Sequence, residues 1–236
     1  MLIRIFESIY RRLVVYLGIH HYVNYLRRKG VVVGDNFCAF NLNTINIDLS
    51  RPSLITIGDN VSVNRNFTIL THDFVSGIFI RCYSDVLPST GCVRIGNNVR
   101  TGQNVTLLKG VTIGDNVFIG ANSLVTKDIP SNCIAGGNPC KVIISLDDYY
   151  EKRRVACIKE AFDFAKSIQE RFHRRPVLLD FREEYTLFID GTNFYQYPEF
   201  HNFMKSQLGV HFDTYIKQHK AMFPSFDEFL AAAGIQ

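Results

Sequence analysis

A repeat of six residues constrains the fold of this 236-residue chain more than any other feature. An α-helix repeats about every 3.6 residues and a simple strand about every two, so neither explains this period. Short strands that turn at Gly-Asp or Gly-Asn corners, where glycine tolerates a positive φ, do explain it. Stacked turns of this kind predict a parallel β-solenoid with a narrow aliphatic interior. Two interleaved columns hold for six hexads: Ile95, Thr101, Leu107, Ile113, Ile119 and Val125, and Val99, Val105, Val111, Val117, Ser123 and Ile129.

The same period occurs upstream, but in a different register. Ile69 and Ile95 lie 26 residues apart, which is four hexads plus two. A segment between about residues 71 and 92 therefore leaves the solenoid and returns out of phase. Long loops on rigid scaffolds tend to carry function, so we expect this excursion loop to contribute to the functional site. The upstream column is Val33, Ala39, Ile45, Arg51, Ile57, Val63 and Ile69.

Composition separates two flanks from the repeat, which occupies residues 31–146. Residues 1–30 carry six Lys or Arg against one acidic residue. Their apolar residues recur at helical spacing, which predicts an amphipathic helix with Ile5, Ile9, Leu13 and Tyr16 on its apolar face. This helix either caps the open first coil or attaches weakly to an anionic membrane surface, and we favour the cap.

Residues 147–236 hold 18 of the 30 Phe and Tyr residues. The segment 147–172 predicts a helix that ends before Arg174-Arg175-Pro176. Ser225-Phe-Asp-Glu228 has the spacing of a helix capping box. We therefore expect a mostly α-helical, aromatic-rich extension.

Charge and cysteine content limit the partners and the compartment. The net charge of +4 is too small to predict nucleic-acid binding. The six cysteines form no CxxC pair, which favours reduced thiols in a cytosolic protein. We expect a cytoplasmic protein, with peripheral contact at the inner face of the membrane through residues 1–29 as an open alternative.

Two segments near the end of the repeat, residues 113–130 (IGDNVFIGANSLVTKDIP) and residues 135–143 (AGGNPCKVI), resemble the hexapeptide-repeat acyltransferases. The resemblance is to the sugar O-acetyltransferase branch, which includes maltose and galactoside acetyltransferases and enzymes that modify bacterial polysaccharides. Thr71-His72-Asp73 resembles the catalytic motif of that branch. The resemblance covers about residues 31–146 and implies a left-handed parallel β-helix, whose hand the period alone does not fix. It also implies a homotrimer with each active site between two chains.

His72 is the only histidine between His21 and His173. Acyl transfer from a thioester to a hydroxyl needs a group that removes the hydroxyl proton, and an imidazole is suited to this because it titrates near neutral pH. The position of His72 at the opening of the excursion loop, together with the resemblance, predicts that it is the general base. Asp73 is the second catalytic candidate: it either orients the ring or caps the backbone of the loop.

The resemblance further implies residues that bind acetyl-CoA, the expected co-substrate. The pantetheine arm would lie along the backbone near Gln103, Ala121 and Thr126, and Lys127 and Lys141 would lie near the phosphates. Thr126-Lys127 also fits a solvent-facing corner, and Lys141 also fits the end of the solenoid. The candidate acceptor-binding residues are Asn41, Asn43 and Asn64, although asparagine also suits solenoid corners.

These features predict an acetyl-CoA-dependent O-acetyltransferase that acts on a hydroxyl of a sugar or polysaccharide precursor by direct transfer in a ternary complex. One alternative is N-acetylation of a nucleotide-linked amino sugar, which would share the base and the coenzyme. Another is a non-catalytic solenoid module. A zinc enzyme of the carbonic-anhydrase type needs several histidine ligands, and residues 31–146 contain one histidine, so we expect no metal.

Overall fold

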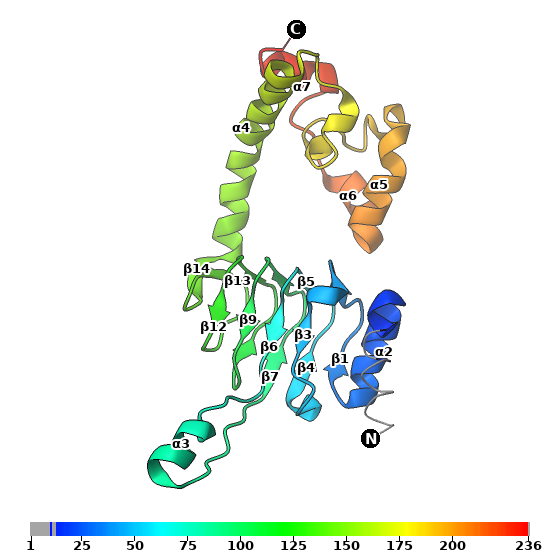
Figure 1. The fold of residues 1–236 in the computed structure, drawn as a ribbon. Helices are drawn as coiled ribbons and strands as arrows, with labels where there is room; N and C mark the ends of the chain where they lie inside the picture. The colour runs from blue at the N-terminus through cyan, green and yellow to red at the C-terminus, as the bar shows by residue number, and fades with distance from the viewer. Residues whose placement is uncertain (1–9, 11–12, 236) are drawn as a thin grey trace. The chain divides into compact units, whose positions relative to one another are not determined.

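The structure, a computed structural model, describes residue 10 and residues 13–235, and it divides into two compact units that meet between Tyr150 and Glu151. The first unit is a parallel β-helix with three sheets (Figure 1). Sheet 1 contains β1 (Val32–Val33), β4 (Ile55–Ile57), β7 (Val93–Ile95) and β10 (Thr112–Ile113). Sheet 2 contains β2 (Cys38–Ala39), β5 (Ser62–Val63), β8 (Arg100–Thr101), β11 (Val117–Ile119), β13 (Cys133–Gly136) and the antiparallel β14 (Lys141–Ser145). Sheet 3 contains β3 (Asn46–Ile47), β6 (Thr68–Ile69), β9 (Thr106–Leu107) and β12 (Leu124–Val125).

The interior of the solenoid confirms the two columns predicted between residues 95 and 129. Every member of both columns is buried, including the polar Thr101 and Ser123. Ile95 pairs with Ile113, and Leu107 with Val125, so these coils contain 18 residues, or three hexads. Burial of each aliphatic side chain contributes about 1.5–3 kcal/mol, and each coil covers the open end of the coil before it.

The first coil departs from the predicted register. Val33 pairs with Ile57, 24 residues away, because two short 3₁₀ helices, η1 (Leu42–Thr44) and η2 (Pro52–Leu54), lengthen its corners. The prediction that Ile45 and Arg51 continue the strand column was therefore wrong. Ile47 holds the strand position, and Arg51 is the N-cap of η2. The six extra residues equal one hexad, so the period appeared unbroken in the sequence.

The corners also depart from the prediction, because asparagine and not glycine adopts the positive φ at most of them. The preceding glycine is needed for close stacking: a Cβ on Gly58 would lie 2.7 Å from the carbonyl oxygen of Gly96 in the next coil. Asparagine tolerates the left-handed region because its short polar side chain bonds locally. Six of these side chains donate from Nδ2 to Oδ1 of the asparagine in the next coil at 2.7–3.2 Å, and Asn122 and Asn132 accept. The asparagines are Asn36, Asn60, Asn66, Asn98, Asn104, Asn116, Asn122 and Asn132.

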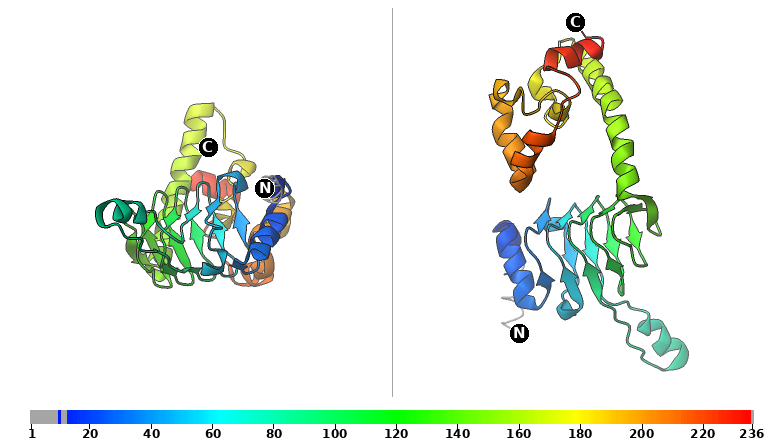
Figure 2. Two further views of the ribbon diagram at one scale, coloured as in Figure 1. Left: turned by 60° about the horizontal axis from the view of Figure 1, so that its bottom comes forward. Right: turned by 180° about the vertical axis from the view of Figure 1, so that it is seen from behind.

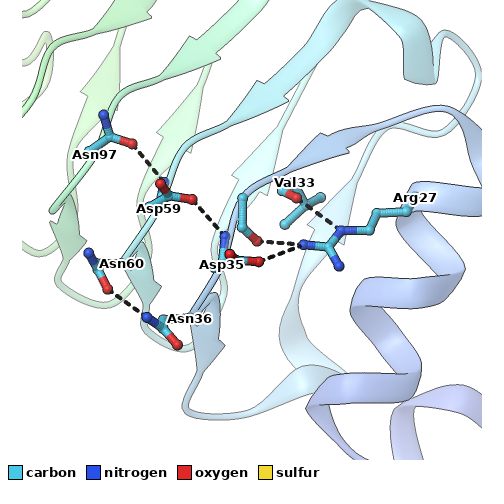
Figure 3. Close-up of polar contacts among 8 residues, drawn as sticks. Arg27, Val33, Asp35, Asn36, Asp59, Asn60 and Asn97 are labelled. Atoms are coloured by element: carbon cyan, nitrogen blue, oxygen red, sulfur yellow. Dashed lines mark hydrogen bonds and ion pairs between the residues drawn. The ribbon is translucent and has the colours of Figure 1, made fainter. Parts of the chain in front are cut away.

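Helix α2 (Ile19–Lys29) covers the first coil, and its Tyr22, Tyr25 and Leu26 join the solenoid core. The Arg27 side chain donates from Nε to the carbonyl oxygen of Val33 at 2.9 Å, and from Nη2 to that of Gly34 at 2.9 Å (Figure 3). The view from behind places α2 beside β1, at the end of the solenoid opposite β14 (Figure 2). Helix α2 is thus fixed to the first coil by both apolar packing and hydrogen bonds.

The apolar face predicted for the N-terminal helix was only partly correct. Residues 13–16 are helical, but Leu13 and Tyr16 are exposed and Val14 is the buried residue. Gly18, with φ of 101°, interrupts the helix between residues 13–16 and α2. The buried face of α2 therefore does not continue the apolar face of residues 13–16. Ile5 and Ile9 lie outside the described residues.

The excursion loop is an arm that leaves the solenoid after Thr71 and returns at Gly91. Its two ends are joined by the hydrogen bond from the backbone N–H of Gly91 to the carbonyl oxygen of Thr71, at 3.0 Å, and by an antiparallel bridge between His72 and Thr90. The arm carries α3 (Ser76–Tyr83), which stands clear of the coils (Figure 1). The predicted loop is therefore closed at its root and projects from a single corner.

The second unit is helical, as the sequence predicted. Helix α4 (Leu146–Phe172) leads into it, followed by α5 (Pro198–Leu208), α6 (Phe212–Gln218) and α7 (Phe226–Ala232), with the 3₁₀ helices η3 (Leu178–Asp180), η4 (Glu184–Leu187), η5 (Phe194–Gln196) and η6 (Gly209–His211) between them. Its core is rich in aromatic rings, among them Phe181, Phe188 and Phe229. Ser225 accepts a hydrogen bond from the backbone N–H of Glu228 and caps α7. Within residues 13–235, no helix has the length and apolar character required to cross a bilayer.

Candidate active site

The candidate site lies at the corner where sheet 3 turns into sheet 1, named here the 3–1 corner. Because successive coils stack, this corner brings together side chains that are distant in the sequence. It places Asp48 and Ser50 of the first coil, His72 at the root of the arm, and Lys109 of the next coil along one edge of the solenoid. The arm leaves the solenoid from this same edge.

His72 is paired with Asp48. The Nδ1 atom of His72 lies 2.6 Å from Oδ2 of Asp48, and the His72 side chain is 22% exposed. The backbone N–H of Thr71 donates to the same oxygen at 3.1 Å, and the Thr71 hydroxyl also donates to it. The backbone N–H of Ser50 donates to the other carboxylate oxygen at 3.0 Å. The backbone N–H groups of Thr71 and Ser50 thus hold the Asp48 carboxylate through both of its oxygens.

These contacts determine the protonation pattern of the pair. Burial alone would raise the pKa of Asp48, but the hydrogen bonds from Thr71 and Ser50 outweigh it and hold that pKa below its ordinary value. An ionised carboxylate accepts hydrogen bonds and cannot donate them, so the short contact assigns the His72 proton to Nδ1. In the neutral ring, the lone pair of Nε2 is then available to accept a proton.

Asp73 points to a different set of partners. Its carboxylate lies 2.7 Å from Nζ of Lys109, and it accepts hydrogen bonds from the Ser89 hydroxyl at 2.8 Å and from the backbone N–H of Val75 at 3.1 Å. The hydrogen bond from Lys109 is the main reason that the pKa of Asp73 falls to about 2. Asp73 was expected either to orient the His72 ring or to cap the backbone of the loop. These contacts fit the second role. The carboxylate beside the His72 ring belongs to Asp48.

Four of the five candidate coenzyme-binding residues lie at two different corners, and the fifth lies in β14. Gln103 and Ala121 are exposed at the corner between sheets 2 and 3, named here the 2–3 corner, where they occupy equivalent places in successive coils. Thr126 and Lys127 are exposed at the 3–1 corner, one coil beyond Lys109. Lys141 is exposed at the start of β14. Within one chain, the solenoid therefore keeps Gln103 and Ala121 apart from Thr126 and Lys127.

The candidate acceptor-binding asparagines lie at the 2–3 corner, away from the corner that carries His72. The Asn41 side chain accepts a hydrogen bond from the backbone N–H of Asn43 at 3.1 Å and caps η1. The Asn64 side chain accepts one from the backbone N–H of Arg65 at 2.8 Å. Asn41 and Asn64 thus have local structural roles, and a single chain does not bring the three candidates to His72.

Comparison with known proteins agrees with this architecture. Residues 92–127 match the family model described as bacterial transferase hexapeptide (six repeats). The chain is 39% identical to Protein CapG of Staphylococcus aureus over 158 residues, which cover 67% of this chain and 88% of CapG. The chain belongs to the hexapeptide-repeat acyltransferase family.

Two further relatives of this acyltransferase have named activities. Galactoside O-acetyltransferase of Escherichia coli (strain K12) is 36% identical over 129 residues, which cover 52% of this chain and 60% of that enzyme. The crystal structure of a maltose O-acetyltransferase from Clostridium difficile 630 is 30% identical, with 59% of this chain and 83% of that chain covered and a TM-score of 0.42. Membership of the family also gives the hand of the solenoid, which is a left-handed parallel β-helix.

Sequence reasoning missed Asp48 as the partner of His72 in this acyltransferase. The two residues are 24 apart, and the 3₁₀ helix η2 lies between them, so no regular spacing connects them. The available signal was topological: Asp48 directly follows a strand of sheet 3, and His72 follows the next strand of that sheet by three residues. A carboxylate one coil before a candidate base, at the same corner, is worth testing in other solenoids.

Proposed function

We propose that this acyltransferase is an acetyl-CoA-dependent O-acetyltransferase that modifies a hydroxyl of a sugar or polysaccharide precursor. The pairing of His72 with Asp48 at the root of the arm is the observation that carries the proposal. It supplies a positioned imidazole whose Nε2 is free of the carboxylate. General acid–base catalysis needs such a group within hydrogen-bond reach of the reacting proton.

His72 acts as the general base in this proposal. Its Nε2 accepts the proton of the acceptor hydroxyl while that oxygen forms its bond to the acetyl carbon and the thioester C–S bond breaks. The CoA thiolate leaves, takes this proton back from the imidazolium, and departs as free CoA. The Asp48 carboxylate holds the ring through Nδ1 and stabilises the imidazolium that results. The acetyl group passes directly to the acceptor within a ternary complex, so no covalent acyl-enzyme forms.

The residues along the solenoid edges are suited to an extended thioester substrate. Successive coils present backbone amides at intervals of about 4.8 Å, which suits the amide-bearing pantetheine arm of acetyl-CoA. We assign this role to the backbone near Gln103, Ala121 and Thr126. Lys127 and Lys141, both exposed, would pair with the phosphates. Acetyl-CoA supplies the activated acetyl group.

The relatives support the proposed acceptor class. Galactoside O-acetyltransferase acetylates a galactoside, as its name states, and it shares 36% identity with this chain. A sugar hydroxyl is also the kind of nucleophile that needs a base such as His72, because hydroxyls are weak nucleophiles when protonated. We place Asn41, Asn43 and Asn64 among the candidate acceptor contacts, contributed from a neighbouring chain.

A homotrimer would bring together candidate site residues that lie at different corners of one chain. His72 lies at the 3–1 corner, whereas Gln103, Ala121 and the asparagines lie at the 2–3 corner. A cyclic three-fold arrangement sets the 3–1 corner of one chain beside another corner of its neighbour, which creates equivalent clefts. We therefore propose a homotrimer with the active site between chains.

We also propose a cytoplasmic enzyme that contacts the inner face of the membrane peripherally. Leu13, Tyr16 and Leu17 are exposed on the outer side of the N-terminal helical segment. Residues 1–30 have a charge excess of +5, from six basic residues and one acidic residue. Exposed apolar side chains beside basic ones bind anionic lipid surfaces. Within residues 1–29, we therefore assign weak attachment to the part before α2, because α2 itself caps the first coil.

Replacement of His72 tests the proposed function. Initial rates of CoA release would be measured with acetyl-CoA and a panel of glycosides for the wild type, His72→Ala and His211→Ala. We expect His72→Ala to lower kcat by about 10²–10⁴ while CoA affinity and melting temperature stay near those of the wild type. His211, an exposed histidine of the second unit, serves as the control. Retention of most activity in His72→Ala would refute the assignment of the base.

A further inference from the structure

Phe74 occupies an unusual place beside the proposed base. Its ring centroid lies 5.3 Å from that of His72, with an angle of 67° between the two planes. The residue is 87% exposed, whereas Phe37 and Phe67 of the same unit are buried in the solenoid core. Core packing therefore does not account for an aromatic residue at this position.

The root of the arm holds Phe74 in a defined position. The residue before it, Asp73, is bound to Lys109 and Ser89, and the residue after it, Val75, donates its backbone N–H to Asp73. The bridge between His72 and Thr90 closes the arm on the other side. The Phe74 backbone is thus fixed on both sides, and its ring stands beside the imidazole.

The geometry points to Phe74 as the apolar platform of the acceptor subsite, on which the C–H face of a pyranose ring stacks. This inference rests on the proposed function. Apolar carbons pack at about 3.5–4.0 Å, and the face of an aromatic ring carries partial negative charge that attracts polarised C–H groups. A pyranose stacked on Phe74 carries its hydroxyls over the adjacent imidazole, within reach of Nε2.

The platform defines a class of acceptor. A cyclic sugar with several C–H bonds on one face offers a flat apolar surface to the ring. An open-chain alditol also offers primary and secondary hydroxyl groups, but it has no such face. The enzyme should therefore prefer pyranosides to alditols of equal carbon number, and Phe74 should be the source of that preference.

Steady-state kinetics of Phe74→Ala, Phe74→Trp and Tyr83→Ala test the inference, with a methyl pyranoside and the matching alditol as acceptors. We expect Phe74→Ala to raise KM for the pyranoside about 5- to 50-fold, with much smaller changes in kcat, in KM for acetyl-CoA and in the parameters for the alditol. Phe74→Trp should keep the preference, because it keeps an aromatic face. Tyr83 is an exposed aromatic residue on the same arm, so Tyr83→Ala controls for loss of an exposed ring.

Three results would overturn the inference. The first is an unchanged KM for the pyranoside in Phe74→Ala. The second is an equal rise in KM for both acceptors, which would indicate general damage to the site. The third is a fall in light-scattering mass, which would assign Phe74 to a contact between chains. If the wild type transfers acetyl groups to no sugar, the proposed function itself fails, and this outcome is distinct from the other three.

Discussion

At the scale of the residue, four hydrogen bonds converge on the Asp48 carboxylate. They come from the backbone N–H and the hydroxyl of Thr71, the backbone N–H of Ser50, and Nδ1 of His72. The three donors other than His72 do not change their protonation during a reaction cycle. Asp48 therefore remains an acceptor when the imidazole gains a proton, and the ring keeps its orientation throughout.

Replacement of Asp48 by asparagine tests this arrangement. An amide can donate from Nδ2 to Nδ1 of His72, which favours the tautomer that carries its proton on Nε2 and removes the lone pair the base needs. We expect Asp48→Asn to lower kcat between about 10-fold and about 10⁴-fold, the upper value being the cost of a wrong tautomer in a catalytic triad. We also expect Asp48→Asn to be no more active than Asp48→Ala, although asparagine keeps the shape of the aspartate side chain. Wild-type kcat in Asp48→Asn, with both variants folded by thermal melting, would contradict the assignment of the tautomer.

At the scale of the element, the arm depends on contacts at its root. Asp73 at its start and Ser89 near its end both contact Lys109 of the next coil. This cluster connects the two ends of the arm to the solenoid beside His72. Its charge makes the stability of the arm depend on pH.

The direction of that dependence follows from the lowered pKa of Asp73, about 2 in the folded protein. An unfolded aspartate titrates near 4. The pair therefore stabilises the fold fully above about pH 4, and this stabilisation is lost as the pH falls toward about 2. Asp73→Asn should melt below the wild type at pH 6, and the difference should close between about pH 4 and pH 2. Asp85→Asn, which changes an aspartate on the same arm, is the control, and a difference independent of pH would contradict the role of the ion pair.

Close stacking of the coils gives a second prediction for the elements. A Cβ on Gly102 would lie 2.5 Å from the backbone nitrogen of Ala121, whereas a Cβ on Gly77 in α3 meets nothing within 4 Å. Gly102→Ala should lower the free energy of unfolding by roughly 1–3 kcal/mol, as overpacking does. Gly77→Ala should be neutral or should stabilise by up to about 1 kcal/mol, because alanine favours the helix. Urea denaturation of the two variants measures both changes, and equal effects would refute the stacking argument.

The elements also show what the sequence could reveal. The coils from Ile95 to Ile129 were predictable because each hexad contributes two inward side chains and no insertion disturbs them. The first coil was not predictable in the same way. The corners that contain η1 and η2 add six residues, which equal one hexad, so the sequence did not reveal that Ile47 and not Ile45 holds the strand position. His72 could be predicted as a candidate from its place at the arm and from the resemblance, but its pairing with Asp48 depends on how two coils align, which local patterns do not encode.

At the scale of the whole molecule, the two units follow different physical rules. The solenoid is built from contacts between successive coils, so its period is visible in the sequence. The second unit packs helices and 3₁₀ helices around aromatic rings such as Phe181 and Phe229 without a repeat. Its helical character could therefore be predicted from α4 and the Ser225 cap, but its arrangement could not.

The last prediction concerns assembly, because a single solenoid leaves apolar side chains of sheet 2 exposed. Phe118 is exposed on β11, and Val142 and Ile143 are exposed on the edge strand β14. Burial of such residues between chains would contribute about 25 cal/mol for each Å² removed from water, and it would bring a 2–3 corner to the 3–1 corner of a neighbour. We expect light scattering at micromolar concentration to give three times the chain mass of 27.0 kDa.

Phe118→Arg should lower that mass and the acetyltransferase activity together, because the active site would lose the residues of the second chain. Tyr195→Arg, at an exposed position of the second unit, should change neither. A wild type that remains a monomer, or a monomeric Phe118→Arg with full activity, would show that one chain is sufficient. The coenzyme-binding and acceptor-binding candidates at the 2–3 corner would then not belong to the active site, because a single chain holds them away from His72.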